Sequence, residues 1–323
     1  MKLLGRQDNR KSMSTRAAFG KALLELGASV DNLVVLDGDI SRSTQTVEFS
    51  RRFPTRHFNV GIAEQNQMGV AAGLALAGYR PIVASYAVFA SMRALEQVRT
   101  SICYPRLNVV IAASHGGITP ANDGVTHQAI EDLGIMRTLP NMTVIAPADG
   151  VSLRSLLEQA MGWDGPVYLR MTRDAVPIIY DETEFFSIGK AKQLREGSDV
   201  TLIAMGDMVQ WALEAHECLL EEGIKARVID MHTLKPLDND TVIRTARETG
   251  AIVTVEDHSM HGGLGGAVAE VLTEECLVPQ ARVALRDTFA ESGPYEFLLE
   301  KYGLSTKHIV DAAHGVIQRK EAR

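Results

Sequence analysis

Short apolar runs rich in β-branched residues alternate, in the first part of the chain, with longer stretches whose apolar residues recur at helical spacing. The runs predict strands at residues 33–37, 81–86, 108–114, 143–147 and 167–171. The stretches between them predict helices at residues 14–26, 63–77, 91–103, 127–138 and 151–161. Alternation of this kind is typical of βαβ units and predicts a mostly parallel sheet.

The pattern loosens over residues 173–198, where we expect a connection between two domains. It then restarts, and strands are predicted at residues 200–205, 226–230, 252–256 and 283–286. Helices are predicted at residues 209–220, 240–249 and 265–274, followed by terminal helices that start near Pro294 and Ser305. The sequence therefore predicts an α/β fold with two domains in series, residues 1–185 and residues 186–323.

Composition and charge fit a globular protein of two domains and narrow its class of partners. The chain has 323 residues, of which 46% are apolar, so each domain can bury a core of its own. The formal charge is −7 and no basic tract stands out along the chain. This balance argues against a nucleic-acid partner, which would require neutralisation of phosphates.

The sequence indicates neither export nor a membrane. Residues 1–13 hold one apolar pair, Leu3-Leu4, where a signal peptide needs a longer apolar core. The most apolar stretch, residues 70–90, is broken by Tyr79-Arg80-Pro81 and is not expected to span a bilayer. Three cysteines lie far apart and match no zinc spacing, so we expect a protein of the reducing cytoplasm.

Polar and aromatic residues follow several predicted strands, at the edge of a parallel sheet where ligands usually bind. Gly61 permits a tight turn ahead of Glu64, which falls in the first turn of the next helix. On the pattern alone, a carboxylate that complements the helix dipole is the simpler interpretation of Glu64. Tyr86 and Phe89 could line one wall of a pocket, although ordinary core packing is the simpler interpretation.

The densest cluster is His115-Gly116-Gly117, followed by Asp123-Gly124-Val125-Thr126-His127-Gln128. Its glycines would let a ligand approach the backbone closely; capping and turn residues are the alternative. A metal site is conceivable, but gaps of 8 and 4 residues between its two histidines and its aspartate match no standard ligand pattern. Arg173 follows the last strand of this domain and could hold a phosphate or carboxylate; a surface ion pair is the alternative.

Taken in order, these motifs resemble the C-terminal half of the transketolase family: its pyrimidine-binding domain followed by its C-terminal domain. The resemblance covers essentially the whole chain. It is carried by Gly-Ile-Ala-Glu-Gln at residues 61–65, Tyr-Ala-Val-Phe at 86–89, His-Gly-Gly-Ile at 115–118, Asp-Gly-Val-Thr-His-Gln at 123–128, and Arg-Met-Thr-Arg at 170–173. It implies a cofactor, thiamine diphosphate, whose reactive carbon the protein positions and polarises.

The resemblance also implies roles for individual residues. Glu64 matches the glutamate that contacts N1′ of the aminopyrimidine and so promotes loss of the thiazolium C2 proton. Phe89 matches the aromatic residue that packs on the pyrimidine, with Tyr86 beside it, and Asp39 is a weaker candidate on the cofactor side. His127 would lie near the reacting carbon and the cofactor amine.

On the substrate side, the resemblance implies that a sugar phosphate lies among residues from several loops. Arg173 and His115, the latter as an imidazolium, would hold its phosphate. Asp123 would bind a hydroxyl group, and Arg16 and Ser43 match the family's phosphate contacts more weakly.

One part of the family's site is missing from the sequence. The family holds Mg²⁺ and the diphosphate through a Gly-Asp-Gly motif with a downstream Asn, and Gly38-Asp39-Ile40 and Gly206-Asp207-Met208 both lack the second glycine. We therefore expect no metal ligands on this chain. The resemblance implies an N-terminal transketolase subunit as partner, an α2β2 assembly, and no activity for the chain alone.

Other interpretations stay open at this point. Ile62-Ala63-Glu64-Gln65 is closer to 1-deoxyxylulose-5-phosphate synthases, whereas His115 favours transketolase. The β subunit of a 2-oxo acid dehydrogenase E1 component shares the two-domain plan but has a different loop at residues 123–128. A non-catalytic assembly subunit, or a subunit for a branched, deoxy or sulfonated ketose phosphate, is also conceivable. The glycine-rich segment 258–266 is not a dinucleotide loop, because Val268 replaces the third glycine; its histidines are expected in a turn, and Asp257 has no assigned role.

Overall fold

A computed structural model describes residues 11–322. Residues 1–10 and 323 lie outside the described part, and with them most of the segment in which we expect no export signal. In the described residues, no helix combines the length and the apolar character that crossing a membrane requires.

The first domain is built on a mostly parallel sheet with the strand order β12-β6-β7-β5-β4-β2-β3. The strands are β2 (Leu33–Asp37), β3 (His57–Asn59), β4 (Arg80–Tyr86), β5 (Val110–Ser114), β6 (Thr143–Ile145), β7 (Val167–Arg170) and β12 (Thr233–Lys235). Every residue of β2, β5, β6 and β7 is buried, as expected for strands covered by helices on both faces. The helices are α1 (Thr15–Ser29), α2 (Ser41–Thr44), α3 (Val47–Arg52), α4 (Glu64–Leu76), α5 (Leu95–Gln97), α6 (Asp132–Thr138) and α7 (Gly150–Gly162).

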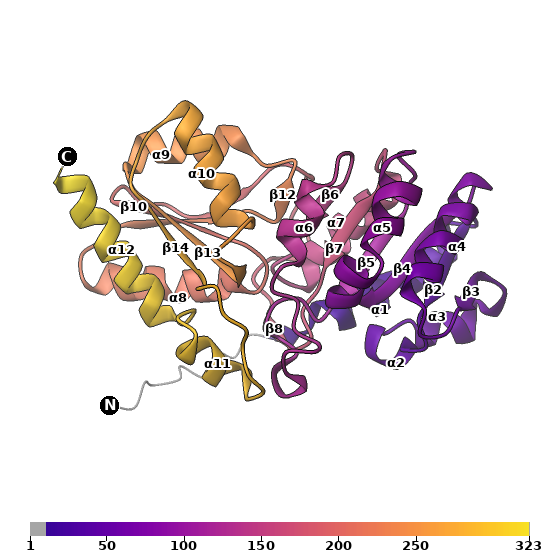
Figure 1. Ribbon diagram of the computed structural model, residues 1–323. Helices are drawn as coiled ribbons and strands as arrows, with labels where there is room; N and C mark the ends of the chain where they lie inside the picture. Colours follow the sequence, from indigo (N-terminus) through magenta and orange to yellow (C-terminus); the bar gives the residue numbers. More distant parts are fainter. Residues whose placement is uncertain (1–10, 323) are drawn as a thin grey trace.

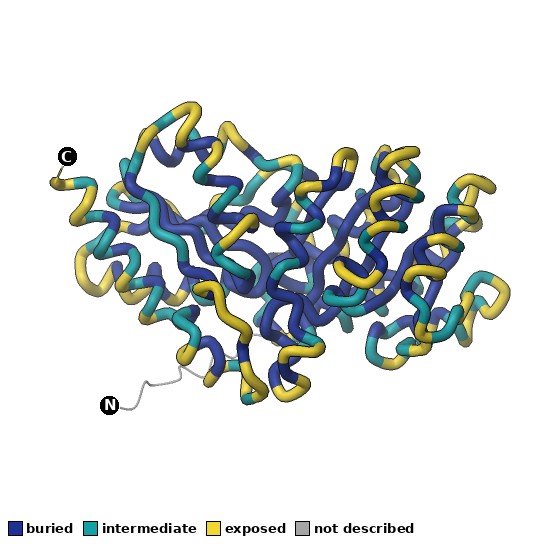
Figure 2. The backbone as a smooth tube through the Cα atoms, in the orientation of Figure 1, coloured by how far each residue is buried: buried dark blue, intermediate teal, exposed yellow. Residues whose placement is uncertain are grey.

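The second domain is a smaller sheet with the strand order β14-β13-β10-β11-β9, in which β9 runs antiparallel to β11. Its strands are β9 (Lys192–Arg195), β10 (Val200–Ala204), β11 (Ala226–Asp230), β13 (Ile252–Ser259) and β14 (Gln280–Leu285). Its helices are α8 (Met208–Glu221), α9 (Asn239–Thr249), α10 (Leu264–Glu275), α11 (Tyr295–Lys301) and α12 (Thr306–Glu321). Figure 1 shows the two sheets side by side, and Figure 2 shows their strands buried between the helices.

The α/β fold class and the serial arrangement of two domains are thus confirmed, whereas the division after residue 185 stays a prediction. The segment that we expected to be a loose connection, residues 173–198, in fact forms β8 (Val176–Pro177) and β9. β8 pairs with β1 (Ser12–Met13). In addition, β12 returns from the second domain to pair antiparallel with β6, so the two domains share an edge of the larger sheet.

Two predicted helices differ from the structure for identifiable reasons. The helix predicted at residues 91–103 is largely π-helical, with segments at Phe89–Arg93 and Val98–Cys103 on either side of α5. π-Helical turns often occur at functional sites. The helix predicted at residues 127–138 starts only at Asp132, because Ala129 exchanges two backbone hydrogen bonds with Gly117 and so holds the preceding residues in a loop.

The connection between the domains contributes a buried acid–phenol pair. The Tyr180 hydroxyl donates to Asp230 Oδ2 at 2.7 Å, at the end of β11. Asp230 is fully buried, and its Oδ1 has no hydrogen bond to a described residue. Burial, with a smaller contribution from Asp149, raises the pKa of Asp230 to about 7.

This pKa predicts how stability depends on pH. In an unfolded chain an aspartic acid loses its proton near pH 4, so between about pH 4 and pH 7 the folded protein holds a proton that the unfolded chain lacks. The contribution of Asp230 to the free energy of unfolding therefore falls as the pH rises through this range, by about 4 kcal/mol at most. We expect Asp230→Asn to remove this dependence and to be more stable than the wild type at pH 8. Urea unfolding at pH 5 and pH 8 measures this pH dependence, and Asp164→Asn, at an exposed aspartate, is the control. An equal change in the free energy of unfolding between the two pH values for wild type and Asp230→Asn would contradict the prediction.

Candidate functional site

The carboxyl ends of β4, β5 and β7 lie side by side and bring three of the predicted motifs together. The parallel register pairs Tyr86 with Ser114, and Ala113 with Arg170. The loops that follow these strands therefore leave the same edge of the sheet. Helix α1 is anchored there as well, because the Thr172 amide donates to Thr15 Oγ1 at 2.7 Å.

Four aromatic side chains form one cluster at this edge. The Tyr86 ring lies 4.1 Å from the ring of His115 and 5.8 Å from that of Phe89, measured between centroids. His127 meets both Tyr86 and Phe89 edge-on, at 5.6 and 5.7 Å. The structure thus brings together four candidate residues that span some forty positions of the sequence.

Glu64 borders this cluster from the first turn of α4. Its side chain is 4% exposed, and its two carboxylate oxygens accept from Arg93 Nη1 at 2.9 and 3.1 Å. The guanidinium carbon of Arg93 lies 4.2 Å from the centroid of the Phe89 ring. A buried carboxylate is thereby held beside an aromatic face, with one arginine in contact with both.

Two arginines lie close to His115 in this cluster. Arg16, in the first turn of α1, donates from Nε to the Arg173 carbonyl at 3.1 Å and from Nη1 to the Ser43 carbonyl at 2.9 Å. Arg173 donates from Nη1 to the Pro120 carbonyl at 2.6 Å and lies 3.7 Å from the Asp123 carboxylate. Burial and the nearby Arg173 lower the pKa of Arg16. Two cations held this close favour an anionic ligand between them.

His115 is buried within this cationic group and is therefore neutral. Its Nδ1 lies 2.9 Å from Ser114 Oγ. Burial first, and then the charges of Arg16 and Arg173, lower the pKa of His115 to about 3. The structure thus favours a neutral imidazole at this position, whereas the resemblance implied an imidazolium. A neutral imidazole can still donate one hydrogen bond to a phosphate oxygen.

The two weaker candidates, Asp39 and Ser43, make fewer contacts with the rest of the candidate site. Asp39 is exposed, has a φ of 67°, and accepts from Asn59 Nδ2 at 2.9 Å. Asn59 in turn accepts from the amide of Gly61, three residues before Glu64. Ser43 contacts Arg16 through its backbone carbonyl, so its hydroxyl takes no part in that contact.

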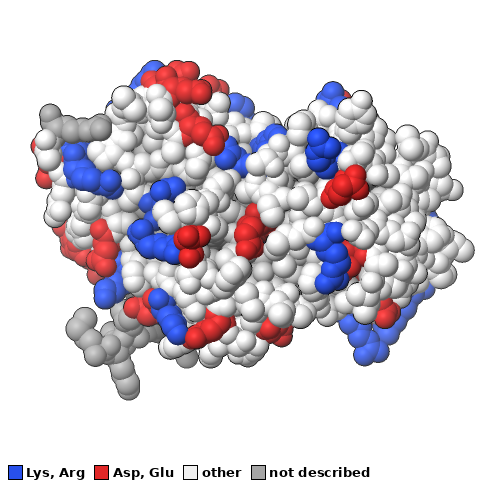
Figure 3. Space-filling view, viewed as in Figure 1, with Lys and Arg blue, Asp and Glu red and all other residues white. Residues whose placement is uncertain are grey.

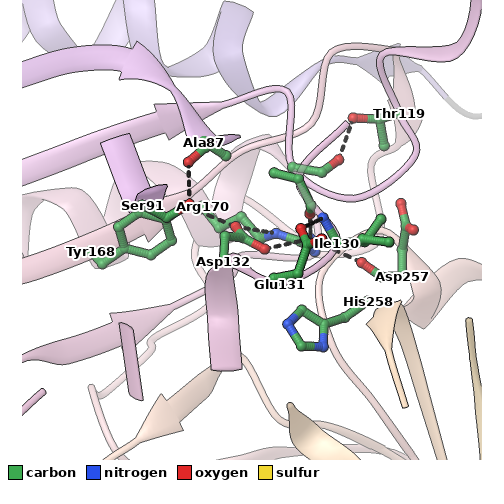
Figure 4. A network of polar contacts seen from close by, with 12 residues as sticks. Ala87, Ser91, Thr119, Ile130, Glu131, Asp132, Tyr168, Arg170, Asp257 and His258 are labelled. Carbon is green, nitrogen blue, oxygen red and sulfur yellow. Dashed lines mark hydrogen bonds and ion pairs between the residues drawn. The ribbon is translucent and has the colours of Figure 1, made fainter. Parts of the chain in front are cut away.

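A buried ionic network lies beneath the loop that carries His115 and connects it to the second domain (Figure 4). Arg170 is 7% exposed and donates from Nε and Nη2 to the two carboxylate oxygens of Asp132, at 2.9 and 3.0 Å. Its Nη2 also donates to the backbone carbonyl of Asp257 on β13 at 2.9 Å. The Asp257 carboxyl group accepts from the Ile118 amide at 2.9 and 3.0 Å. Burial and the neighbouring Asp207 raise the pKa of Asp257 well above its usual range.

This network explains the two glycines after His115. A Cβ atom on Gly116 would lie 2.4 Å from Nε of Arg170, and one on Gly117 would lie 2.0 Å from Oδ2 of Asp257. The glycines therefore leave room for the buried side chains of Arg170 and Asp257, whereas the sequence suggested that they leave room for a ligand. His258, expected in a turn, is instead a buried residue of β13 whose Nε2 accepts from the Gly134 amide.

The sequence interpretation missed Arg93, Arg170 and Asp257. Arg170 offered a signal, because a charged residue inside an otherwise apolar buried strand requires a buried partner. The Glu-Asp-His triplet at the end of the strand predicted at residues 252–256 offered a similar one. Within residues 11–322, no group of three or more His, Cys, Asp or Glu side chains could hold a metal ion.

Comparison with known proteins adds family information to this geometry. A family model described as the transketolase pyrimidine-binding domain matches residues 11–178, and one described as the transketolase C-terminal domain matches residues 189–309. The chain is 46% identical over 308 residues to the 6-deoxy-6-sulfo-D-fructose transketolase subunit of Clostridium sp. (strain MSTE9), a match that covers 95% of this chain and 96% of that protein. It is 47% identical over 297 residues to a putative transketolase C-terminal section of Methanocaldococcus jannaschii, covering 91% and 93%.

A solved structure described as a split gene transketolase, inactive beta4 tetramer, is similar in both sequence and fold. It is 51% identical to this chain, superposes with a TM-score of 0.90, and covers 95% of this chain and 99% of its own.

Proposed function

The chain belongs to the transketolase family, and from this premise we propose that it is the C-terminal subunit of a split transketolase that acts in the cytoplasm. In this proposal the assembled enzyme uses thiamine diphosphate to move a two-carbon ketol unit between sugar phosphates. The observation that carries it is the buried Glu64 carboxylate beside the face of Phe89, next to a pair of arginines suited to an anion.

The residues present fit the aminopyrimidine of the cofactor. The Glu64 carboxylate and the Phe89 ring already contact one planar, nitrogen-rich group, the guanidinium of Arg93. When bound, thiamine diphosphate supplies a nucleophilic carbon that accepts and releases the ketol unit. Glu64 would hold a proton at N1′ of the pyrimidine, and Phe89 with Tyr86 would orient the ring.

The remaining candidates would handle the substrate. His127 meets Phe89 and Tyr86 edge-on, which would place its imidazole between the cofactor side and the sugar. Arg173 and Arg16, with neutral His115 as a hydrogen-bond donor, would bind the phosphate. Asp123 would accept from a sugar hydroxyl group. In this proposal Asp39 lies toward the cofactor, and Ser43 supports Arg16 through its carbonyl.

The exposed face of α4, on the other side of the helix from the buried Glu64, suits a partner subunit. Between residues 65 and 79 there is no Asp, Glu, Lys or Arg, and the surface over α4 is nearly uncharged in Figure 3. Ile62 and Leu76 are 73% and 74% exposed, and a Cβ atom on Gly69 or Gly73 would meet open space. An exposed uncharged face of this kind marks an interaction surface.

We infer that an N-terminal transketolase subunit covers this face and brings Mg²⁺ and the diphosphate site, as an α2β2 assembly. The β4 tetramer to which this chain is similar is described as inactive, which supports a requirement for a second kind of subunit. Capture of the tagged chain from its own cells, followed by mass spectrometry, tests the assignment. We expect a stoichiometric partner that carries Gly-Asp-Gly with a downstream Asn. Elution of the chain alone, without cofactor, would remove the catalytic assignment.

The Arg173 side chain provides a test of substrate binding. We expect Arg173→Ala to raise KM for a phosphorylated aldose acceptor about tenfold to a hundredfold in the assembled enzyme, because a charge-assisted hydrogen bond is lost. Arg173→Lys should recover part of the effect, and Arg52→Ala, at an exposed arginine of α3, should have none. Steady-state kinetics with phosphorylated and unphosphorylated acceptors distinguish the cause. An equal loss for both acceptors would mean that Arg173 acts on the loop and not on the phosphate.

A further inference from the structure

Arg93 makes two contacts that belong to the cofactor in the proposed function. Its Nη1 lies 2.9 and 3.1 Å from the two carboxylate oxygens of Glu64. Its guanidinium carbon lies 4.2 Å above the Phe89 ring. The other ring contacts of Phe89, with Tyr86 and His127, are tilted by 35° and 66° and so are not stacked. The Phe89 face and the Glu64 carboxylate are therefore both engaged by Arg93.

A guanidinium and an aminopyrimidine can occupy such a place by the same chemistry. Both are planar groups with an N–C–N edge, both can donate an N–H to a carboxylate, and both stack on aromatic rings. Neither the carboxylate oxygens nor the ring face can serve both groups in full. One of the two must leave for the other to bind.

The Arg93 side chain is free to move away from Glu64 and Phe89. Its side chain is 48% exposed, whereas that of Glu64 is 4% exposed, so the guanidinium approaches the buried carboxylate from solvent. It is the last residue of the π-helical segment that begins at Phe89, one turn away on the same face. A rotation of its side chain can uncover Phe89 without movement of the backbone.

We propose that Arg93 is a gate that takes the place of the cofactor's aminopyrimidine in the unloaded chain and turns outward when the cofactor binds. This inference rests on the proposed function. The contact keeps a buried carboxylate paired until the pyrimidine arrives, because an unpaired buried charge is costly. It also lowers the apparent affinity for the cofactor, since only molecules with the gate open can bind it.

Thiamine diphosphate binding by the assembled complex, stripped of cofactor and held at saturating Mg²⁺, tests the gate by calorimetry. We expect Arg93→Ala to lower Kd about fivefold to tenfold, the size of effect expected for one partly exposed ion pair and one cation–π contact. The Kd of the Arg93→Lys complex should lie between those of the wild type and Arg93→Ala. Arg99→Ala, at an exposed arginine of the second π-helical segment, is the matched control and should leave Kd unchanged.

A second readout follows Arg93 itself in the full chain. Its Nε–Hε NMR signal, identified by its loss in Arg93→Ala, should be shifted by the Phe89 ring current and should move on Glu64→Gln. A signal insensitive to Glu64→Gln, or an Arg93→Ala complex with unchanged or weaker cofactor binding, would overturn the gate and leave the proposed function intact. A complex in which neither wild type nor any variant binds thiamine diphosphate would instead overturn the proposed function.

Discussion

Replacing Glu64 with alanine is expected to lower kcat of the assembled enzyme about a thousandfold, within the range that a positioned proton-transfer group contributes. Glu64 is a buried acid whose ion-pair partner, Arg93, also lies over the ring of Phe89, the residue that would orient the pyrimidine. Alanine cannot hold a proton at N1′, and glutamine can hydrogen-bond there but cannot take the proton. We therefore expect Glu64→Gln to lose nearly as much activity as Glu64→Ala.

The chain should tolerate this change as a structure. Glu64 contacts Arg93, whose side chain is 48% exposed, so no second buried charge is left unpaired. Assembly, measured by analytical ultracentrifugation, should be retained, and Glu48→Ala at an exposed acid of α3 should keep full activity. A Glu64→Ala complex that assembles and retains full activity would contradict the catalytic role and favour an assembly subunit.

Replacing Arg170 with methionine is expected to destabilise the chain by about 3–5 kcal/mol, because it leaves a buried carboxylate without its counter-ion. Asp132 is fully buried and receives two hydrogen bonds from Arg170 and one from the Tyr168 hydroxyl. Asp257 would also lose the hydrogen bond at its carbonyl. Urea unfolding measures the change, and Arg51→Met, at an exposed pair with Glu48, should cost less than about 1 kcal/mol.

A double variant separates the lost charge from the lost packing. In Arg170→Met with Asp132→Asn, no buried ionised carboxylate remains at this position, so we expect part of the stability to return. The side-chain amide introduced by Asp132→Asn can still accept from the Tyr168 hydroxyl. An Arg170→Met chain within about 1 kcal/mol of wild type would show that the network does not hold the loop to the second domain.

The sequence predicts the layout of the sheets well because burial leaves a direct pattern. Apolar residues make up most of the runs at β2 and β11, and the structure has these strands at the predicted residues. The strand β12 could not be predicted, since three residues carry no periodicity and their pairing with β6 depends on how the domains meet. The sequence did not predict the π-helical segments for a related reason. Their i→i+5 hydrogen bonds produce no distinct spacing of apolar residues over so few turns.

The proximity of several candidate residues was predictable from the sequence, whereas their electrostatics were not. Tyr86, Phe89, His115 and His127 follow strands that a parallel sheet brings to one edge, so their proximity follows from topology. The charge state of His115 does not follow from sequence, since it depends on burial and on Arg16 arriving from the first helix. The role of the glycines at 116 and 117 likewise requires the position of Asp257, which lies in the other domain.

The most direct test of whether this chain is one subunit of a transketolase is to measure transfer of the two-carbon ketol unit. The co-purified complex and the chain alone are each given thiamine diphosphate, Mg²⁺, a ketose phosphate donor and an aldose phosphate acceptor, and the products are identified by mass spectrometry. We expect the complex to give a product two carbons longer than the acceptor, and the chain alone to give no product. Ketol transfer by the chain alone would contradict this expectation. So would a cofactor-loaded complex that transfers no ketol unit from standard, branched, deoxy or sulfonated ketose donors.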